Sequence, residues 1–293
     1  MSYQEKYEFY KTMVESRLER AFPGPGLHEA MRYSLLAGGK RVRPVLTLAF
    51  CEAAGGKAET ALDVGCGVEM LHTYSLIHDD LPCMDNDDLR RGKPTNHKVY
   101  GETIAVLAGD ALQAAAFQAV LSAPLDAAVR ARAGKLLADA VGPTGMCLGQ
   151  YRDTLEDGKL HTVQELTAIN DTKTGALLRA ACTMGVTAAG GEGAEEEQRL
   201  AAARDYATDL GLAFQIRDDI LDVISTAEEL GKPIGSDAAN QKSTFASLLG
   251  VEECEKLVEE YTRKAKAALD RTSWSGDVTF LRELADAMVA RES

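Results

Sequence analysis

Residues 104–121 read IAVLAGDALQAAAFQAVL, a stretch that is apolar around almost its whole circumference when it is drawn as a helix. Residues 176–189 have the same character. Helices without a polar face are usually buried at the centre of a large protein, so both segments predict a helical core. Elsewhere apolar residues recur at three- and four-residue steps, and alternation with a period of two is rare. The chain is therefore expected to be all-α.

The composition agrees with this fold class. The chain has 293 residues, of which 45% are hydrophobic and only 6% aromatic. Alanine and leucine carry the apolar share, which favours helix over a β-sandwich. Glycine and proline breaks separate about ten expected helices, and none of these breaks resembles an interdomain linker. We predict one large helical bundle, a single domain over residues 1–293.

Charge and cysteine content limit the possible partners. A formal net charge of −13 argues against nucleic acid or an anionic membrane surface. The six cysteines form no Cys-x-x-Cys pair, which fits reduced thiols in the cytoplasm. The start of the chain has no apolar signal region, and residues 111–125 are too short to span a bilayer. We expect a cytoplasmic protein without membrane insertion.

The first chemically informative cluster is Asp79–Asp88, which follows the apolar run Val68–Ile77. Asp79 and Asp85 would lie about 120° apart on a regular helix. They can share a metal ion only if the helix ends or loosens near Pro82, and a proline inside a helix makes such a break reasonable.

The second cluster is Asp218–Asp222, inside the apolar stretch Leu210–Ile224. Asp218 and Asp222 are four residues apart, so their carboxylates lie about 40° apart on a helix and point the same way. Gln215 lies on that face one turn earlier.

Carboxylates flanked by buried apolar residues either have raised pKa values or hold cations. Oxygen ligands without histidine or cysteine spacing favour Mg²⁺, which takes its remaining ligands from water and phosphate. A solvated acidic surface is the plain alternative. An EF-hand does not fit, because the sequence lacks the required glycine and the final glutamate at the right offsets. A metal phosphohydrolase would need more histidines at metal-ligand positions than the isolated ones present.

Basic residues follow a similar clustered pattern. Gly38–Pro44 places Lys40, Arg41 and Arg43 at an expected helix break, and Arg90 and Arg91 directly follow the first aspartate cluster. Such runs form phosphate sites, helix caps or surface ion pairs. His72 lies seven residues before Asp79, almost on the same helix face. Together the clusters suggest a cavity for a metal–diphosphate and a hydrocarbon.

With these motifs in their order, the chain resembles the short-chain trans-prenyl diphosphate synthases. The motifs DDxxxxD and DDxxD correspond to residues 79–85 and 218–222, and GGKRxRP corresponds to residues 38–44. Phe214-Gln215, Lys173-Thr174-Gly175 and Leu148-Gly149-Gln150 with Asp153 also agree. The resemblance implies an all-α bundle around a deep central cavity, usually as a homodimer. It departs from the family at residues 242–246 and at Asn86.

The resemblance also implies roles for single residues. Asp79 and Asp85 would bind two Mg²⁺ ions, and Asp218 and Asp222 a third, all holding an allylic diphosphate. The isopentenyl diphosphate would be bound by Lys40, Arg43, His72 and Arg91. The allylic diphosphate would contact Arg90, Lys173, Lys232 and Lys242, with Thr174 and Gln215 near its reacting carbon.

Product length is expected to depend on Tyr74 and Ser75, which lie about 6 to 7.5 Å below Asp79 along a helix axis. A bulky Tyr74 and the longer first motif resemble members that make the C15 product more than those that make C20. An ideal helix turns Tyr74 about 140° away from Asp79, so an ordinary core position stays open. Two rivals also stay open, a non-catalytic subunit of a heteromeric synthase and a terpene cyclase.

Overall fold

The computed structural model describes residues 1–155, 161–224 and 243–290. It confirms the all-α prediction, because these residues form fourteen α-helices, twelve of them eight residues or longer. One two-residue hairpin, β1 (Leu89–Arg90) with β2 (Lys93–Pro94), is the small exception. The helices are α1 (Tyr3–Glu19), α2 (Leu27–Leu35), α3 (Val42–Ala53), α4 (Ala58–Asp79), α5 (Asn96–Tyr100), α6 (Glu102–Leu121), α7 (Ala127–Val141), α8 (Met146–Leu155), α9 (Val163–Asn170), the π-helix η1 (Asp171–Gly175), α10 (Ala176–Ala188), α11 (Gly193–Ile224), α14 (Phe245–Leu249), α15 (Val251–Ala268), the 3₁₀-helix η2 (Leu269–Arg271) and α16 (Thr279–Val289).

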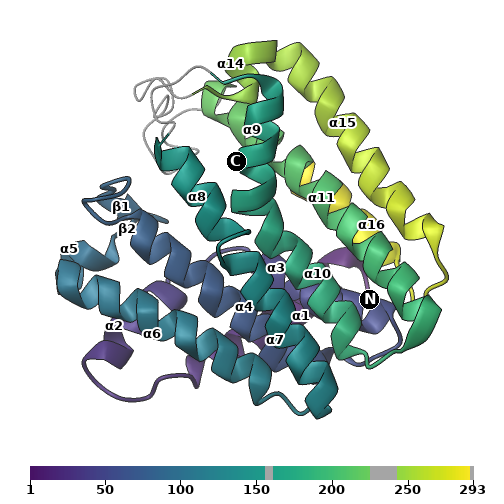
Figure 1. The fold of residues 1–293 in the computed structure, drawn as a ribbon, viewed down its shortest axis with the longest axis horizontal. Coiled ribbons are helices and arrows are strands. Elements are labelled where there is room, and N and C mark those ends of the chain that lie inside the picture. The colour runs from purple at the N-terminus through teal and green to yellow at the C-terminus, as the bar shows by residue number, and fades with distance from the viewer. Residues whose placement is uncertain (156–160, 225–242, 291–293) are drawn as a thin grey trace. The chain divides into compact units, whose positions relative to one another are not determined.

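The chain divides into two compact units (Figure 1). Unit 1 consists of residues 1–137 and 184–190, and unit 2 consists of residues 138–183 and 191–293. Each unit carries one of the two aspartate motifs. The expectation of a single domain over residues 1–293 stays a prediction.

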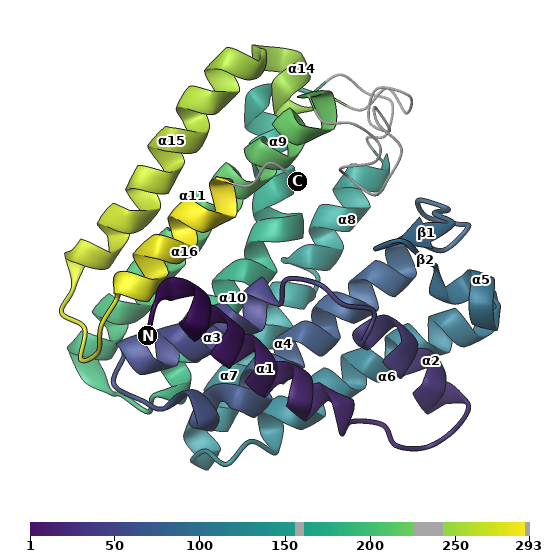
Figure 2. The same ribbon diagram turned by 180° about the vertical axis from the view of Figure 1, so that it is seen from behind.

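Helix α4 is the central element of unit 1, where it packs against α3 and α6 (Figures 1 and 2). Small residues allow these close approaches. A Cβ atom added at Gly67 would lie 2.8 Å from both the carbonyl oxygen of Ala116 and Cγ2 of Val120 on α6. Gly65 plays the corresponding part toward α3, where an added Cβ would lie 3.0 Å from Cδ1 of Leu48. This packing fixes the helix whose C-terminal end carries the first aspartate motif.

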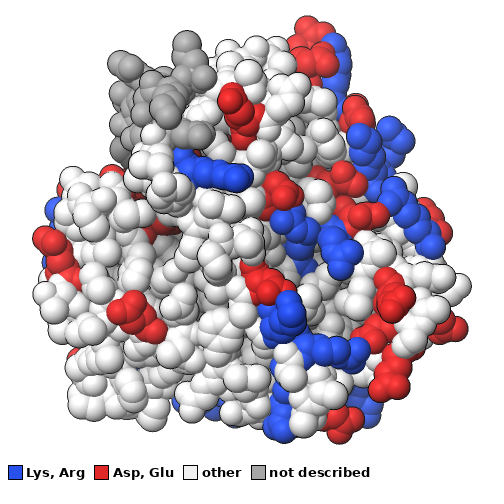
Figure 3. All heavy atoms as spheres, in the orientation of Figure 1, with Lys and Arg blue, Asp and Glu red and all other residues white. Residues whose placement is uncertain are grey.

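The two all-round apolar segments differ in their burial. Helix α10 is buried along almost its whole length, as the sequence predicts. Helix α6 is buried on one face only, because Val106, Leu107 and Leu121 are exposed. Figure 3 shows the surface over α6 as largely uncharged. When a helix is apolar on all sides, its sequence does not show which of its faces is buried and which is exposed.

Helix α6 is also longer than the stretch 111–125 suggests, because it begins at Glu102. By length and composition it is the one helix of the described residues that is long and apolar enough to cross a membrane. Core helices of soluble proteins pass the same test, so a single such helix is weak evidence. The absence of membrane insertion stays a prediction.

Unit 2 is built around α11, along which α15 packs (Figure 1). A hydrophobic cluster joins α9, α11, α14 and α15, with members that include Leu166, Ile216, Ile220, Phe245 and Val258. Helix α8 approaches η1 so closely that a Cβ added at Gly149 would lie 2.3 Å from the backbone nitrogen of Lys173. A π-helical turn such as η1 is rare in proteins and often marks a functional position.

The α4–α6 contact gives a test of this packing. We expect Gly67→Ala to lower the free energy of unfolding by about 1 to 3 kcal/mol, because backbone atoms of α6 must move to accept the methyl group. Gly134→Ala in α7 is the matched control, since its Cβ meets only the flexible side chain of Leu121 and gains up to about 1 kcal/mol of helix propensity. Urea unfolding measures both changes. Equal stability of the two variants would contradict the expected close contact.

Candidate functional site

The first aspartate motif lies where α4 ends, as the sequence predicts from Pro82. The helix stops at Asp79, and the next residues form turns. The chain then folds back, so that the backbone N–H of Asp85 donates to the carbonyl oxygen of Asp79 over 2.9 Å. Asn86 has a left-handed φ of 55°, which asparagine tolerates better than most residues. The break thereby brings Asp85 back to the end of the helix that carries Asp79.

Asp80 is a site residue that the sequence analysis did not assign. Its side chain is buried and accepts a hydrogen bond from Nε of Arg90 over 2.7 Å. Burial raises the pKa of Asp80, and the guanidinium of Arg90 opposes that effect. The structure therefore places Arg90 on Asp80 and within 3.6 Å of Asp87. The expected contact between Arg90 and a diphosphate stays a prediction.

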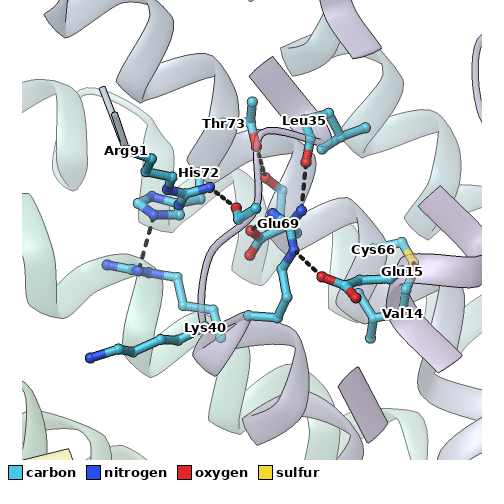
Figure 4. A network of polar contacts seen from close by, with 12 residues as sticks. Val14, Glu15, Leu35, Lys40, Cys66, Glu69, His72, Thr73 and Arg91 are labelled. Atoms are coloured by element: carbon cyan, nitrogen blue, oxygen red, sulfur yellow. Dashed lines mark hydrogen bonds and ion pairs between the residues drawn. The ribbon is translucent and has the colours of Figure 1, made fainter. Parts of the chain in front are cut away.

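The glycine-rich basic motif forms the connection between α2 and α3, as expected for a helix break. Gly38 and Gly39 have φ angles of 95° and 124°, which side chains rarely adopt. A Cβ added at Gly39 would lie 2.7 Å from the guanidinium carbon of Arg91. Arg91 donates to the carbonyl oxygen of Gly38 (Figure 4). The two glycines thus allow an arginine from the β-hairpin to lie directly on the loop.

Arg43 and His72 meet beside this loop, with Nη1 of Arg43 3.3 Å from Nε2 of His72 (Figure 4). Burial and the nearby charge of Arg43 hold the pKa of His72 well below its ordinary value. The imidazole is therefore neutral at pH 7, and its Nε2 accepts from Arg43. Nε of Arg43 is buried and has no hydrogen-bond partner among the residues that the structure describes.

The structure thus brings together three of the four residues expected to bind isopentenyl diphosphate. The fourth, Lys40, lies in the same loop with an exposed side chain, and its carbonyl oxygen accepts from the hydroxyl of Tyr7 over 2.5 Å. Of the three cations among these residues, Arg43 is half-buried and Lys40 and Arg91 are exposed. A local group of cations is the chemistry that binds a diphosphate in a protein of net charge −13. We call Lys40, Arg43, His72 and Arg91 the basic cluster.

A second set of predicted residues lies together in unit 2. Nζ of Lys173 is 2.6 Å from Oδ2 of Asp153, so α8 and η1 are joined by an ion pair. Lys173, Thr174, Gln215 and Asp153 line one cavity of about 210 Å³. Asp153 and Lys173 are far apart in the sequence. They meet because Gly149 has no side chain and so allows α8 to contact η1.

The middle aspartate of the second motif has a structural role that the sequence analysis missed. Asp219 accepts from the amide of Gln215 over 3.0 Å and from the backbone N–H of Phe245 over 2.7 Å. It therefore ties the start of α14 to α11. Asp218 is half-buried and Asp222 is buried, four residues apart on α11. The binding of a metal ion by Asp218 and Asp222 stays a prediction.

Tyr74 and Ser75 both lie half-buried on α4. The ring of Tyr74 meets the ring of His78 edge-on, with centroids 5.1 Å apart. His78 in turn lies 3.0 Å from the carbonyl oxygen of Val106 on α6. The hydroxyl of Ser75 donates to the carbonyl oxygen of His72 over 2.9 Å. Tyr74 therefore packs on the side of α4 that faces α6, and its role in product length stays a prediction.

Two expected diphosphate ligands, Lys232 and Lys242, lie outside the described residues. Among the described residues, no group of three or more histidine, cysteine or acidic side chains is placed to hold a metal by itself. Mg²⁺ needs only one or two carboxylates beside phosphate oxygens and water, so the aspartate motifs still fit it. The C-terminal end of α4 also carries negative dipole charge that favours a cation beside Asp79.

Arg41 and Glu69 are a further pair that sequence reasoning missed. They form a buried ion pair of 2.7 Å beneath the basic cluster. A signal was present in the sequence, because Glu69 is a lone acid within the apolar run Val68–Ile77, and such residues are rarely buried unless paired.

Comparison with known proteins agrees with this site. The model of the family described as polyprenyl synthetase matches residues 25–274. The chain belongs to the polyprenyl synthetase family. Its relatives are prenyltransferases of isoprenoid biosynthesis, and the family is typically Mg²⁺-dependent.

Relatives with different products are similarly close. A chloroplastic geranylgeranyl pyrophosphate synthase of Capsicum annuum is 49% identical over 247 residues, which cover 83% of this chain and 66% of that protein. A farnesyl diphosphate synthase of Geobacillus stearothermophilus is also 49% identical, over 82% of each chain. The chain therefore spans just under two thirds of the pepper relative's length.

A solved structure supports the fold. The crystal structure of an FPP/GFPP synthase from Zymomonas mobilis superposes with a TM-score of 0.85 at 36% identity, covering 98% of this chain and 99% of that one.

The lowered pKa of His72 predicts a pH dependence of stability. Below about pH 6.5 the unfolded histidine binds a proton that the native imidazole does not, so the unfolded state binds more protons. The free energy of unfolding must then fall with falling pH, by up to about 1.4 kcal/mol per pH unit from this group. Urea unfolding between pH 5 and 7.5 measures the slope. We expect His72→Gln to have a smaller slope, and equal slopes would contradict the assignment.

Proposed function

We propose that the chain is a Mg²⁺-dependent trans-prenyl diphosphate synthase, which condenses isopentenyl diphosphate with dimethylallyl and geranyl diphosphates to give farnesyl diphosphate and diphosphate. The observation that carries this proposal is the basic cluster, in which a buried Nε of Arg43 lacks a partner among the described residues. Such a donor needs a hydrogen-bond acceptor, and an anionic oxygen is the acceptor that a guanidinium binds most strongly. Family membership makes a prenyl diphosphate the fitting anion.

The basic cluster would bind isopentenyl diphosphate without a metal ion. Arg43 and Arg91 supply fork-shaped donors, and neutral His72 orients Arg43 by accepting its Nη1 hydrogen bond. Lys40 would add an ammonium group from the same loop. Because Arg91 is tied to the carbonyl oxygen of Gly38, the loop and the hairpin hold their cations in fixed positions. Fixed charges of this kind lose little entropy on binding.

The aspartate motifs would hold the allylic diphosphate through three Mg²⁺ ions, two at Asp79 and Asp85 and one at Asp218 and Asp222. Bound there, Mg²⁺ supplies the positive charge that makes diphosphate a better leaving group. Lys173 would contribute an ammonium group from η1, where Asp153 fixes its position. Thr174 and Gln215 line the same cavity and would lie near the reacting carbon.

The reaction then needs no nucleophilic side chain. Departure of diphosphate leaves an allylic carbocation, whose charge is stabilised by the preorganised surroundings. The double bond of isopentenyl diphosphate attacks the cation and forms the new carbon–carbon bond. The departed diphosphate takes the proton that is lost, and apolar walls exclude water that would quench the cation.

Product length is the finer part of the proposal. Relatives of nearly equal identity carry the names of C15 and C20 synthases. The bulk of Tyr74 below Asp79 and the longer first motif support farnesyl diphosphate, and geranylgeranyl diphosphate is the alternative. The ring of Tyr74 packs edge-on against His78, which in turn contacts the carbonyl oxygen of Val106 on α6.

The oligomeric state and location are also proposed. The exposed apolar residues of α6 support a homodimer, because apolar surface of this kind is covered in stable assemblies. A cytoplasmic location fits the free cysteines of the described residues. A net charge of −13 argues against nucleic acid as a partner.

Two rivals differ in observable ways. A non-catalytic subunit of a heteromeric synthase would be inactive when purified, although it would keep the fold. A terpene cyclase would have no use for the basic cluster as a second diphosphate site. One assay separates these cases. The purified chain is incubated with Mg²⁺, isopentenyl diphosphate and dimethylallyl diphosphate, and the products are identified by mass spectrometry.

Turnover tests the metal assignment. We expect Asp79→Ala and Asp218→Ala each to lower turnover by about 10²-fold or more, since each removes a group that stabilises the leaving diphosphate. Asp88→Ala is the matched control, because Asp88 belongs to the same acidic run but forms an exposed ion pair with Lys98. Near-normal turnover in both motif variants would overturn the metal assignment.

Product analysis tests Tyr74. We expect Tyr74→Ala to shift the product toward C20, because a smaller side chain leaves room for one more isoprene unit. Tyr100→Ala is the control, since the ring of Tyr100 packs on Tyr33, 5.6 Å away. An unchanged C15 distribution in Tyr74→Ala would remove this residue from the floor of the cavity.

A further inference from the structure

The loop that carries the basic cluster has an unusual residue at its end. Arg41 precedes α3 in the left-handed conformation, with φ 54° and ψ 31°. This conformation is unfavourable for a residue with a Cβ atom. Its carbonyl oxygen still accepts from Val45 over 3.1 Å and so starts the helix. Something must hold Arg41 in place.

The side chain of Arg41 supplies that restraint, and its partners Glu15, Leu35 and Glu69 are labelled in Figure 4. Nη1 donates to Oε1 of Glu69 over 2.7 Å, and Nη2 donates to the carbonyl oxygen of Leu35 over 2.8 Å. Nε lies 3.5 Å from Oε1 of Glu15 on α1. The guanidinium group therefore links α1, the end of α2 and the middle of α4. Arg41 and Glu69 are only 3% and 2% exposed, so neither charge is free to contact a substrate from solvent.

Helix α4 contacts the start of α3 at two points one turn apart. Glu69 binds Arg41, the residue before α3, and His72 binds Arg43 in the first turn of α3. Residues three apart on a helix share a face, so α4 holds both arginines in one register. Moving Arg41 would move Arg43 with it.

The carboxylate of Glu69 also acts electrostatically on the basic cluster. Burial lowers the pKa values of Arg43 and Arg91, and the carboxylate of Glu69 opposes that change for both. Among the described residues its second oxygen, Oε2, is buried without a hydrogen-bond partner. The hydrogen bond of its other oxygen goes to Arg41.

We propose, on the basis of the function proposed above, that the buried pair Arg41–Glu69 positions the basic cluster for the diphosphate of isopentenyl diphosphate. Neither residue touches the substrate. Glu69 fixes Arg41, and Arg41 fixes the end of the loop and the start of α3, which carry Lys40 and Arg43. The pair therefore contributes to the binding of isopentenyl diphosphate and not to that of the allylic diphosphate.

The double variant Arg41→Met/Glu69→Met tests this role. Replacing a buried ion pair by apolar side chains often leaves stability unchanged, so the fold should persist. We expect the KM for isopentenyl diphosphate to rise by about tenfold or more, and the KM for geranyl diphosphate and kcat to change by less than about twofold. A merely structural role would change all three together. Unchanged kinetics in a folded double variant would overturn the proposal.

The matched control is Arg17→Met/Asp63→Met. Arg17 and Asp63 form a 2.7 Å ion pair that joins α1 to α4, as the buried pair does through Glu15, but it is more exposed. We expect its KM for isopentenyl diphosphate to stay within about twofold of the unaltered chain, because surface pairs contribute little. A rise equal to that of the buried double variant would show a general effect of loosening α1 from α4, and would count against the proposal.

Glu69→Gln gives a second test whose sign separates two explanations. If Glu69 acted only through its charge, its removal would relieve repulsion and strengthen binding of an anion. If it positions Arg41, its removal weakens binding instead. We expect Glu69→Gln to bind inorganic pyrophosphate more weakly than the unaltered chain does. Calorimetry in buffer with a chelator measures this binding. Arg43→Gln, measured in the same way, is the reference for the loss of a direct contact. Stronger binding than that of the unaltered chain would overturn the proposal, and this single change decides the matter if the double variant does not fold.

The two experiments also separate failure of the inference from failure of the proposed function. If the unaltered chain binds pyrophosphate but turns over no prenyl diphosphate, the proposed function fails. If turnover is normal and Glu69→Gln binds pyrophosphate as the unaltered chain does, the positioning role fails.

Discussion

Burial of charge is the constraint on which the rest of this structure depends. A helical core has no place for an unpaired cation or carboxylate, because desolvation costs several kcal/mol for each ion. Unit 1 nevertheless buries Arg41, Glu69 and Asp80 and half-buries Arg43 and His72. Ion pairs within the protein offset this cost for Arg41 and Asp80, whereas Nε of Arg43 is buried without a hydrogen-bond partner among the described residues.

Helix α4 organises these charges because it presents them at helical spacing. Glu69, His72 and Asp79 follow one another along a single helix, and His72 and Asp79 lie about 10 Å apart along the axis on nearly the same face. His72 contacts Arg43 of the basic cluster, and Asp79 ends the helix at the first aspartate motif. Close packing through Gly65 and Gly67 fixes α4 between α3 and α6, so both groups are held by one rigid element.

Much of this arrangement follows from local sequence rules, and the exceptions depend on distant contacts. Pro82 predicts the end of α4, and the glycine pair before Lys40 predicts the break between α2 and α3. Both predictions are confirmed. The contact of Arg90 with Asp80 was not predictable, because it depends on how the hairpin folds back over the turn. The partnership of Arg41 and Glu69 joins residues 28 positions apart, and no local pattern specifies such a contact.

The same distinction explains why product length is harder to derive than the reaction. The charged groups are recognisable because a diphosphate requires particular residue types at particular spacings. The length of a hydrocarbon depends only on the space left by packed side chains. Here the ring of Tyr74 lies against His78, and His78 is confined by Gly109, where an added Cβ would lie 2.1 Å from Nε2 of the imidazole. The packing of Tyr74 on this side of α4 therefore depends on His78 and Gly109 as well. Relatives that share about half of their residues with this chain accordingly carry the names of C15 and C20 synthases.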